Sequence, residues 1–346
     1  MRKPIFTLLA FCFLSILATP LQAAQTQAEA SPVTLHYPKE VGDGTAFPVT
    51  VRGEGLESMT LSFLNRSITA KPDKTASSYP EIVLLLPVPL DHESGPATLT
   101  WSAKYANGSA GGGSATITIT KRKYPVQELT VAPQYVTPDP ALKERLDRER
   151  AQMGAALNTR SSVRHWDLPM ARPVPGKITS LYGLRRVLNG KPRSAHKGLD
   201  FRGAESSPIK AIADGTVVLT GDFYYAGQFV ILDHGLGVVS ISMHMSEIIA
   251  TRGQTVKTGD VIGLVGSTGR STGPHLHLGI SVLGQSIDAL PLIAQTEEDK
   301  AAYAAAMQKA SEVPRKKSVK KTGESGKKKK NSAKPIKKTA KQPIKQ

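Results

Sequence analysis

The sequence predicts a mostly β protein: an N-terminal immunoglobulin-like β-sandwich, a connector helix, a C-terminal antiparallel β domain and a disordered basic tail. Three observations lead to this fold class. Short apolar and β-branched runs recur between Gly, Pro, Asn and Asp in two long stretches of the 346 residues, a length that suggests about two domains. Helical periodicity is confined to one segment between these stretches and a short one after them. Residues 314–346 are rich in Lys, Ser, Thr, Pro and Gly and cannot bury enough surface to fold.

Residues 1–24 have the three parts of a secretory signal peptide. Arg2 and Lys3 form a basic start, residues 5–18 are mostly apolar, and Gln22-Ala23-Ala24 closes the segment with small residues. The apolar run is shorter than the roughly 20 residues that a membrane-spanning helix needs, and an uncleaved anchor is the alternative. We therefore expect an exported protein of the periplasm, the cell envelope or the extracellular space.

Cys12 is the single cysteine of the chain. Phe11 precedes it inside the apolar run, which disfavours a lipoprotein signal, and cleavage of the signal peptide would remove it. The mature chain would then hold no thiol nucleophile and no cysteine ligand, which excludes cysteine-protease chemistry and Cys-ligated metal sites. An ordinary hydrophobic core must hold the fold together.

Residues 33–125 are predicted to form the sandwich. Strand-like runs occur at residues 47–51, 81–86 and 115–120, with turn residues between them. In the last run Ala115, Ile117 and Ile119 share one face, and threonines occupy the other. Six or so such runs are typical of an immunoglobulin-like antiparallel sandwich. His36 and His92 stand alone here, and we expect them to be surface or loop residues.

Residues 137–158 are predicted to form the connector helix. Thr137 or Asp139 can cap it, and Pro140 lies in the first turn, where proline is tolerated. A thin apolar stripe runs along it, formed by Leu142, Leu146, Met153 and Leu157. The helix should therefore pack on one narrow face. His165, which follows it, is expected to have no role in the site.

Residues 173–293 are predicted to form a second all-β domain. Gly-rich turns alternate with strand-like runs, for example at residues 216–219, 229–232 and 238–243, and helical periodicity is weak. Thr296 and Asp299 then resemble a capping box, which predicts a final short helix over residues 296–310.

The basic character of the chain is concentrated at its ends. The net charge is +17, of which residues 315–346, with 14 Lys or Arg and one Glu, contribute +13. The part predicted to fold is nearly neutral. An export signal and a tail without interleaved aromatic residues argue against specific nucleic-acid binding. We expect the Lys-rich tail to hold the chain near anionic surfaces of the cell envelope.

The first segment with candidate metal-binding side chains is His196-Lys197-Gly198-Leu199-Asp200. A spacing of four residues fits one face of a helix or one face of a strand. Gly198 disfavours the helix, and on an extended chain it leaves the space between His196 and Asp200 clear. Taken alone, the pattern fits ordinary polar residues as well as a metal site.

The second segment, residues 273–282, alternates as a strand does. One face would carry His275, His277, Gly279 and Ser281, and the other, core-facing, Leu276, Leu278, Ile280 and Val282. Histidines two residues apart on a strand are roughly 6.5–7 Å apart along it. Both can approach one metal site, one as ligand and one toward its water. A solvent face that happens to hold two histidines is the alternative.

The third segment, residues 239–244, also separates into two faces. We predict Val239, Ile241 and Met243 on the core side and Ser240, Ser242 and His244 on the polar side. His244 alone would fit an ordinary surface residue. His234 lies at a predicted turn, and we expect it to be structural.

Together these segments predict a catalytic zinc centre. Catalytic Zn²⁺ usually takes three protein ligands from His and carboxylate and keeps one position open. His196, Asp200 and His277 supply two imidazoles and one carboxylate. His244 and His275 remain to orient water, move its proton and stabilise the oxyanion. No Glu follows the pattern of an HExxH helix, so imidazole must perform the acid–base chemistry.

At these residues the chain resembles the lysostaphin/LytM-type zinc metallopeptidases, which act on peptidoglycan. Besides the histidine segments, the resemblance takes in residues 178–186, 211–217, 259–263 and 266–269. It implies zinc ligands at His196, Asp200 and His277 and catalytic roles for His244 and His275. It also implies peptide stems or bridges of the wall as substrate. Ser242 stands where many relatives carry a tyrosine, which affects a substrate contact rather than the metal.

The sequence therefore predicts a zinc-dependent endopeptidase that hydrolyses cross-links or stems of bacterial peptidoglycan. One alternative is a zinc-containing but inactive wall-binding or regulatory module for other peptidoglycan hydrolases. Another is a lipoyl- or biotin-carrier domain, because residues 256–263 are similar to the hairpin turn of such a domain. A carrier has no use for the histidines.

Overall fold

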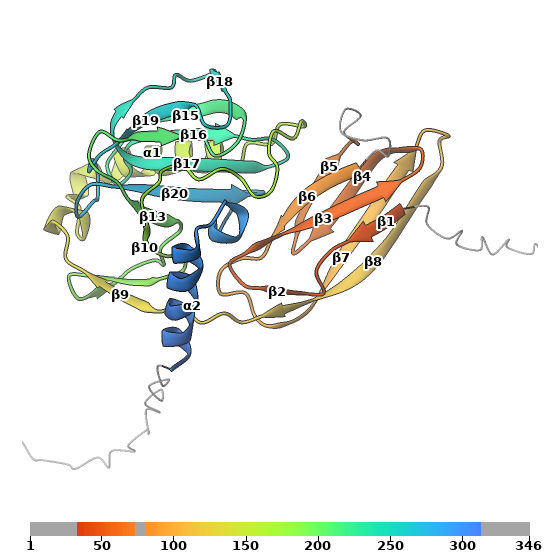
Figure 1. The fold of residues 1–346 in the computed structure, drawn as a ribbon, viewed down its shortest axis with the longest axis horizontal. Helices are drawn as coiled ribbons and strands as arrows, with labels where there is room; N and C mark the ends of the chain where they lie inside the picture. Colours follow the sequence, from red (N-terminus) through yellow and green to blue (C-terminus); the bar gives the residue numbers. More distant parts are fainter. Residues whose placement is uncertain (1–32, 73–80, 313–346) are drawn as a thin grey trace, which may run out of the picture.

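The computed structural model describes residues 33–72 and 81–312, which form two β-rich units side by side (Figure 1). The predicted signal peptide, residues 1–24, and the predicted tail, residues 314–346, lie outside the described residues. Strands dominate both units, which confirms the mostly β fold class. In the described parts, no helix is both long and apolar enough to cross a membrane.

The N-terminal unit consists of two sheets. One contains β1 (Val33–His36), β3 (Ala46–Gly53) and β6 (Glu81–Pro87). The other has the order β2 (Glu40–Gly42), β8 (Ala110–Thr120), β7 (Gly95–Tyr105), β4 (Leu56–Phe63) and β5 (Arg66–Ala70). Buried residues of both sheets, such as Leu84 and Ile117, belong to one hydrophobic cluster. The immunoglobulin-like type of this unit remains a prediction.

A connecting segment joins the two units and includes a strand that the sequence pattern did not predict. The segment runs through β9 (Val126–Leu129), the 3₁₀ turns Pro133–Tyr135 and Pro140–Leu142, and α1 (Lys143–Leu157). Asp139 caps the second turn by accepting a hydrogen bond from the Ala141 amide. β9 pairs in parallel with β11 (Arg185–Leu188), which also pairs with β12 (Lys191–Pro192). A four-residue strand offers too little periodicity to be recognised from sequence.

The C-terminal unit is built on a ten-stranded antiparallel sheet whose main path is β10-β13-β20-β17-β16-β15-β18. Its strands are β10 (Ile178–Ser180), β13 (Leu199–Arg202), β14 (Pro208–Lys210), β15 (Gly215–Phe223), β16 (Gly227–Asp233), β17 (Val238–Ile248), β18 (Thr255–Val256), β19 (Val261–Val265), β20 (His275–Val282) and β21 (Gln285–Ile287). β20 lies between β13 and β17, and its Leu276, Leu278, Ile280 and Val282 side chains are at most 1% exposed. Its opposite face carries the histidines.

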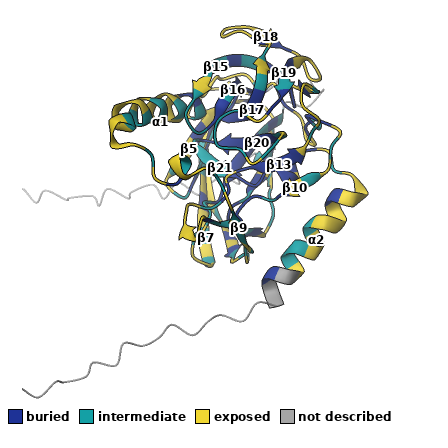
Figure 2. Ribbon diagram, turned by 90° about the vertical axis from the view of Figure 1, so that its left-hand side faces the viewer, coloured by how far each residue is buried: buried dark blue, intermediate teal, exposed yellow. Residues whose placement is uncertain are grey.

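The predicted orientation of residues 239–243 is wrong. Met243 pairs with His277 and Ser242 with Leu278, so Val239, Ile241 and Met243 share the histidine face of the sheet. They belong to a second apolar cluster, to which α1 also contributes. One side of α1 covers this part of the sheet, and the other side of the helix is exposed (Figure 2). Ser240 and Ser242 lie on the other, core-facing side. Because both faces of β17 are covered, its apolar alternation does not identify the core side.

The described part of the chain ends with a helix that is capped at its N-terminus. The 3₁₀ turn Leu290–Leu292 leads to α2 (Glu297–Glu312). Thr296 donates its amide to the Asp299 carboxylate, and the Asp299 amide donates to the Thr296 hydroxyl. This reciprocal pair satisfies two amides at the helix start that would otherwise lack partners.

Candidate metal centre

Three ligand atoms converge where β13 meets β20. His196 Nε2 lies 3.0 Å from Asp200 Oδ1 and 3.0 Å from His277 Nδ1, and His277 Nδ1 lies 2.8 Å from the same carboxylate oxygen. All three residues are buried. The cross-strand pairing of Asp200 with His277 brings two of them together, and His196 enters from the segment just before β13.

Gly198 makes this approach possible. A Cβ atom at this position would lie 2.6 Å from His277 Nε2 and 2.5 Å from the Leu278 carbonyl oxygen. Neither the backbone oxygen nor a histidine fixed in a site can move far enough to accept such an atom. The glycine therefore leaves the space that the His277 ring occupies.

The protonation pattern of the cluster favours a cation at its centre. His196 Nδ1 lies 2.8 Å from the Leu181 carbonyl oxygen, which can only accept, so this nitrogen donates. The Nε2 atom of the neutral ring then presents a lone pair toward Asp200 and His277.

The spacing of the ligand atoms suits zinc. Tetrahedral Zn²⁺ with bonds of about 2.0–2.1 Å requires ligand atoms roughly 3.3 Å apart. The three atoms are 2.8–3.0 Å apart and need to separate only slightly. Two imidazoles and one carboxylate are also a ligand set that catalytic zinc uses. The residues therefore fit the metal that the sequence predicted.

Arg186 is a part of the centre to which the sequence analysis assigned no role. Its guanidinium donates to Asp200 Oδ2 at 2.9 Å, on the carboxylate oxygen that does not face the histidines. This contact fixes the rotation of the carboxylate and leaves Oδ1 for the cluster, as partners of metal ligands commonly do. An arginine next to a glycine-rich turn has no sequence feature that separates it from a surface residue.

His244 reaches the site through a β-bulge. Regular alternation would place it on the core side of β17 with Ser242. Instead, the register shifts between Gln228 and Val230 of the neighbouring strand, and His244 adopts a left-handed backbone with φ of 64°. The bulge turns its side chain to the same face as Met243 and His277. Left-handed non-glycine residues are uncommon and cluster at functional sites.

His275 and His244 are neighbours with matching hydrogen bonds. Their ring centroids are 4.8 Å apart. His244 donates Nδ1–H to the Thr268 carbonyl at 2.8 Å, and His275 donates Nδ1–H to the Gly273 carbonyl at 2.8 Å. Each neutral ring thus keeps an Nε2 lone pair. Burial, together with His277 and His275, lowers the pKa of His244 to about 3, so this ring is neutral at physiological pH.

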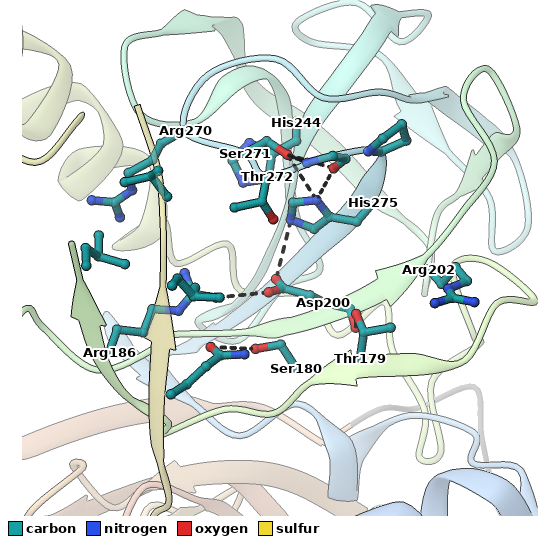
Figure 3. Close-up of a pocket in the computed structure, with 16 residues that line it drawn as sticks. Thr179, Ser180, Arg186, Asp200, Arg202, His244, Arg270, Ser271, Thr272 and His275 are labelled. Atoms are coloured by element: carbon teal, nitrogen blue, oxygen red, sulfur yellow. Dashed lines mark hydrogen bonds and ion pairs between the residues drawn. The ribbon is translucent and has the colours of Figure 1, made fainter. Parts of the chain in front are cut away.

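A cavity of about 350 Å³ opens onto these residues. Asp200, His244 and His275 line it, and Figure 3 shows Arg270 and Arg186 on one side of Asp200 and Arg202 on the other. Residues of the connecting segment, including Gln127 of β9, form another wall. Ser242 is not among the lining residues and faces the core side.

The remaining histidines lie away from the centre. His36 and His165 are exposed, and His92 is partly exposed. His234 is fully buried and donates Nδ1–H to the Asp214 carbonyl at 2.7 Å, while its Nε2 lies 2.8 Å from the Ser240 hydroxyl. These two hydrogen bonds give it a structural role.

Comparison with known proteins places this site in a family. Residues 194–289 match the model of peptidase family M23. The DD-carboxypeptidase/endopeptidase Mpg of Neisseria meningitidis is 42% identical over 138 residues, which cover 39% of this chain and 32% of that protein. The peptidoglycan DD-endopeptidase ShyA of Vibrio cholerae is 40% identical over 121 residues, covering 34% and 28%. The chain therefore spans about a third of the length of the curated relatives it matches.

A solved structure extends the similarity beyond the matched domain. A Pseudomonas aeruginosa chain assigned to peptidase M23 is 27% identical, with a TM-score of 0.56. The match covers 72% of the present chain and 94% of the Pseudomonas chain. The likeness thus includes a large part of the chain outside residues 194–289.

Proposed function

Because residues 194–289 belong to peptidase family M23, as the motifs predicted, we propose that this chain is a zinc-dependent endopeptidase of bacterial peptidoglycan. The observation that carries the proposal is the convergence of His196, Asp200 and His277 beside a cleft that also holds His244 and His275. The names of two relatives as DD-endopeptidases support peptide cross-links of the wall as the substrate.

Zinc would be held by His196 Nε2, Asp200 Oδ1 and His277 Nδ1. When bound, it would act as a Lewis acid that lowers the pKa of water and polarises the peptide carbonyl. Arg186 holds the other oxygen of Asp200 and so keeps the ligand oriented. The cluster is mostly buried, and Asp200 reaches the cleft, so water and substrate would meet the ligands from that side.

His244 and His275 would perform the proton transfers. In the neutral form of each ring Nδ1 donates to a backbone carbonyl, so the lone pair that can accept a proton is on Nε2. One can accept a proton from the attacking water and return it to the leaving amine. The ring that has accepted this proton is cationic and can also stabilise negative charge on the tetrahedral carbonyl oxygen. The other, neutral ring can orient the attacking water by accepting a hydrogen bond at Nε2.

The place of action follows from the substrate. An enzyme that cuts peptidoglycan works outside the cytoplasmic membrane, in the periplasm, cell envelope or extracellular space. The predicted signal peptide, residues 1–24, supports this location, although it lies outside the described residues.

The test compares wild-type protein with His277→Ala and His165→Ala. We expect one zinc per wild-type chain by elemental analysis and release of peptide fragments from purified peptidoglycan, detected by mass spectrometry. His277→Ala should lose both because it removes a ligand. His165→Ala removes an exposed histidine outside the centre and should keep both.

Two results would contradict the proposal in different ways. Full zinc retention by His277→Ala would reject the ligand assignment. Wild-type protein that contains zinc but releases no fragment from any wall preparation would favour the inactive, regulatory alternative. The masses of released fragments would also identify the bond that is cut.

A further inference from the structure

The cleft has an unusual balance of charge. Among the described residues that line it, Asp200 is the single acid, whereas Arg186, Arg202 and Arg270 contribute three guanidinium groups. Asp200 is already engaged by the histidines and by Arg186. The part of the chain between its basic ends is nearly neutral, so this concentration of arginines is local to the cleft.

Arg270 differs from the other two arginines in its surroundings. Arg186 donates to Asp200, and Arg202 is exposed to solvent. Arg270 is partly buried, with its guanidinium 4.8 Å from the centre of the Tyr225 ring, and no carboxylate of the described residues forms an ion pair with it. Burial lowers the pKa of Arg270, and the nearby charges of Arg186 and Arg193 lower it further. A guanidinium in this position is stabilised by an added anion.

The loop that carries Arg270 fixes its place relative to the histidines. The Arg270 amide donates to the Tyr225 carbonyl at 3.0 Å. Gly269 has φ of 68° and lies against Gly227, where a Cβ atom would be 2.3 Å from the Gly227 nitrogen. In the same loop, the Thr268 carbonyl holds His244 at 2.8 Å. Arg270 and one proposed catalytic histidine are thus positioned by the same rigid segment.

We infer that Arg270 is a specificity-determining residue that binds a free carboxylate of the substrate peptide beside the bond to be cut. The inference rests on the proposed function and names the substrate class within it. A planar guanidinium binds a carboxylate through two parallel hydrogen bonds. Stem peptides of peptidoglycan carry free carboxylates, whereas a bridge made of glycine alone carries none. Carboxylate-bearing stem cross-links, and not glycine bridges, are the substrate class that this cleft fits.

The experiment pairs two peptides with four forms of the full-length protein. The peptides are a synthetic stem cross-link with a free carboxylate next to the scissile bond and the same peptide with that group amidated. The proteins are wild type, Arg270→Gln, Arg270→Lys and Arg252→Gln. Arg252 is an exposed arginine of the same domain that does not line the cleft, so it controls for the loss of one charge. Binding is measured by calorimetry, and kcat/KM is measured by fragment release.

Wild type and Arg252→Gln should bind and cut the carboxylate peptide about 10- to 100-fold better than the amide, the usual effect of a charged hydrogen bond. Arg270→Gln should lose that difference, because its binding and cleavage of the carboxylate peptide should weaken while those of the amide stay unchanged. Arg270→Lys should keep part of it, because it retains the charge but not the planar donor pair. All four proteins should contain equal zinc.

Three outcomes separate the possibilities. An unchanged preference for the carboxylate peptide in Arg270→Gln overturns the inference, and so does an equal loss on both peptides, which indicates a purely structural arginine. Carboxylate-dependent binding that disappears in Arg270→Gln without hydrolysis by wild type supports the inference and contradicts the proposed function. The binding and cleavage measurements therefore distinguish failure of one from failure of the other.

Discussion

Three histidines of the centre are oriented by one device. His196, His244 and His275 each donate Nδ1–H to a backbone carbonyl, those of Leu181, Thr268 and Gly273, at 2.8 Å. A carbonyl cannot rotate or change its protonation, so each ring keeps a fixed tautomer with Nε2 free. The proposed ligand His196 and the two proposed proton carriers are therefore oriented by the fold before substrate binds.

At this residue scale we predict that His244→Ala and His275→Ala retain zinc and fold but lose turnover. Neither residue belongs to the cluster of His196, Asp200 and His277, so elemental analysis should give wild-type zinc content. Loss of a positioned acid–base group typically costs roughly 10²–10⁴ in rate. The measurement is the rate of fragment release from peptidoglycan. Near-normal hydrolysis by both variants would reject the assignment.

Among the elements, β20 and β17 show where sequence patterns suffice and where they fail. In β20 the apolar residues face the core as predicted, because the opposite face is polar along its length. In β17 the pattern misleads, since α1 covers the face that carries Val239 and Ile241. The His244 side chain reaches the site only because of a bulge and a left-handed backbone at this residue. A glycine would have indicated such a backbone in the sequence, but this position holds a histidine.

Arg186 and Arg270, which lie beside the centre, could not be recognised from the sequence either. Arg186 reaches Asp200, and Arg270 lies against Tyr225 at the cleft, only because contacts between distant segments place them there. The three proposed ligands could be predicted from the sequence because metal binding depends directly on residue type and spacing, and both are visible there. The capping pair Thr296 and Asp299 was readable for the same reason: all its atoms lie within one short segment.

At the scale of the β16–β17 turn we predict a pH effect on stability from His234. Burial lowers the pKa of this ring in the folded chain below its ordinary value of about 6.5. Below that pH the unfolded chain binds a proton that the folded chain resists. The contribution of neutral His234 to stability is therefore present above about pH 6.5 and lost as the pH falls below it.

The measurement is Tm between pH 5 and 8 for wild type, His234→Gln and His36→Gln. We expect Tm of wild type to fall toward pH 5 more steeply than that of His234→Gln, which keeps a buried polar side chain but cannot be protonated. His36 is exposed and lies in β1 of the N-terminal unit, away from His234, so its variant should follow wild type. Parallel curves for all three proteins would show that His234 does not titrate on unfolding.

At the scale of the whole molecule, the two β units are joined by buried polar contacts and by a continuous apolar cluster. Arg122 of the N-terminal unit donates to Asp288 of the C-terminal unit at 2.9 Å and contacts Tyr303 of α2. Asp288 is 1% exposed, so loss of Arg122 would leave a carboxylate buried without its cation. Arg66 also reaches across to the Leu283 carbonyl at 2.6 Å. These contacts hold the site, the N-terminal unit and α2 in one arrangement.

The basic tail follows α2 in the sequence, and α2 is held against both units by these contacts. Residues 315–346 carry +13 of the net charge and lie outside the described residues. Peptidoglycan and membrane surfaces are rich in carboxylate and phosphate. A Lys or Arg near an anionic membrane surface contributes about 1 kcal/mol to binding, within a Debye length of about 8 Å at physiological salt. We propose that the tail holds the enzyme close to its insoluble substrate.

Removal of residues 315–346 should weaken sedimentation of the protein with isolated walls or anionic vesicles at low salt, and high salt should abolish the difference from wild type. Cleavage of a small soluble peptide should not change, because the tail lies outside the catalytic domain. A tail of equal length with every Lys and Arg replaced by Gln separates charge from length and should behave as the truncation does. Equal low-salt binding by wild type and both variants would reject the tether, and a solvated tail that serves solubility would then remain.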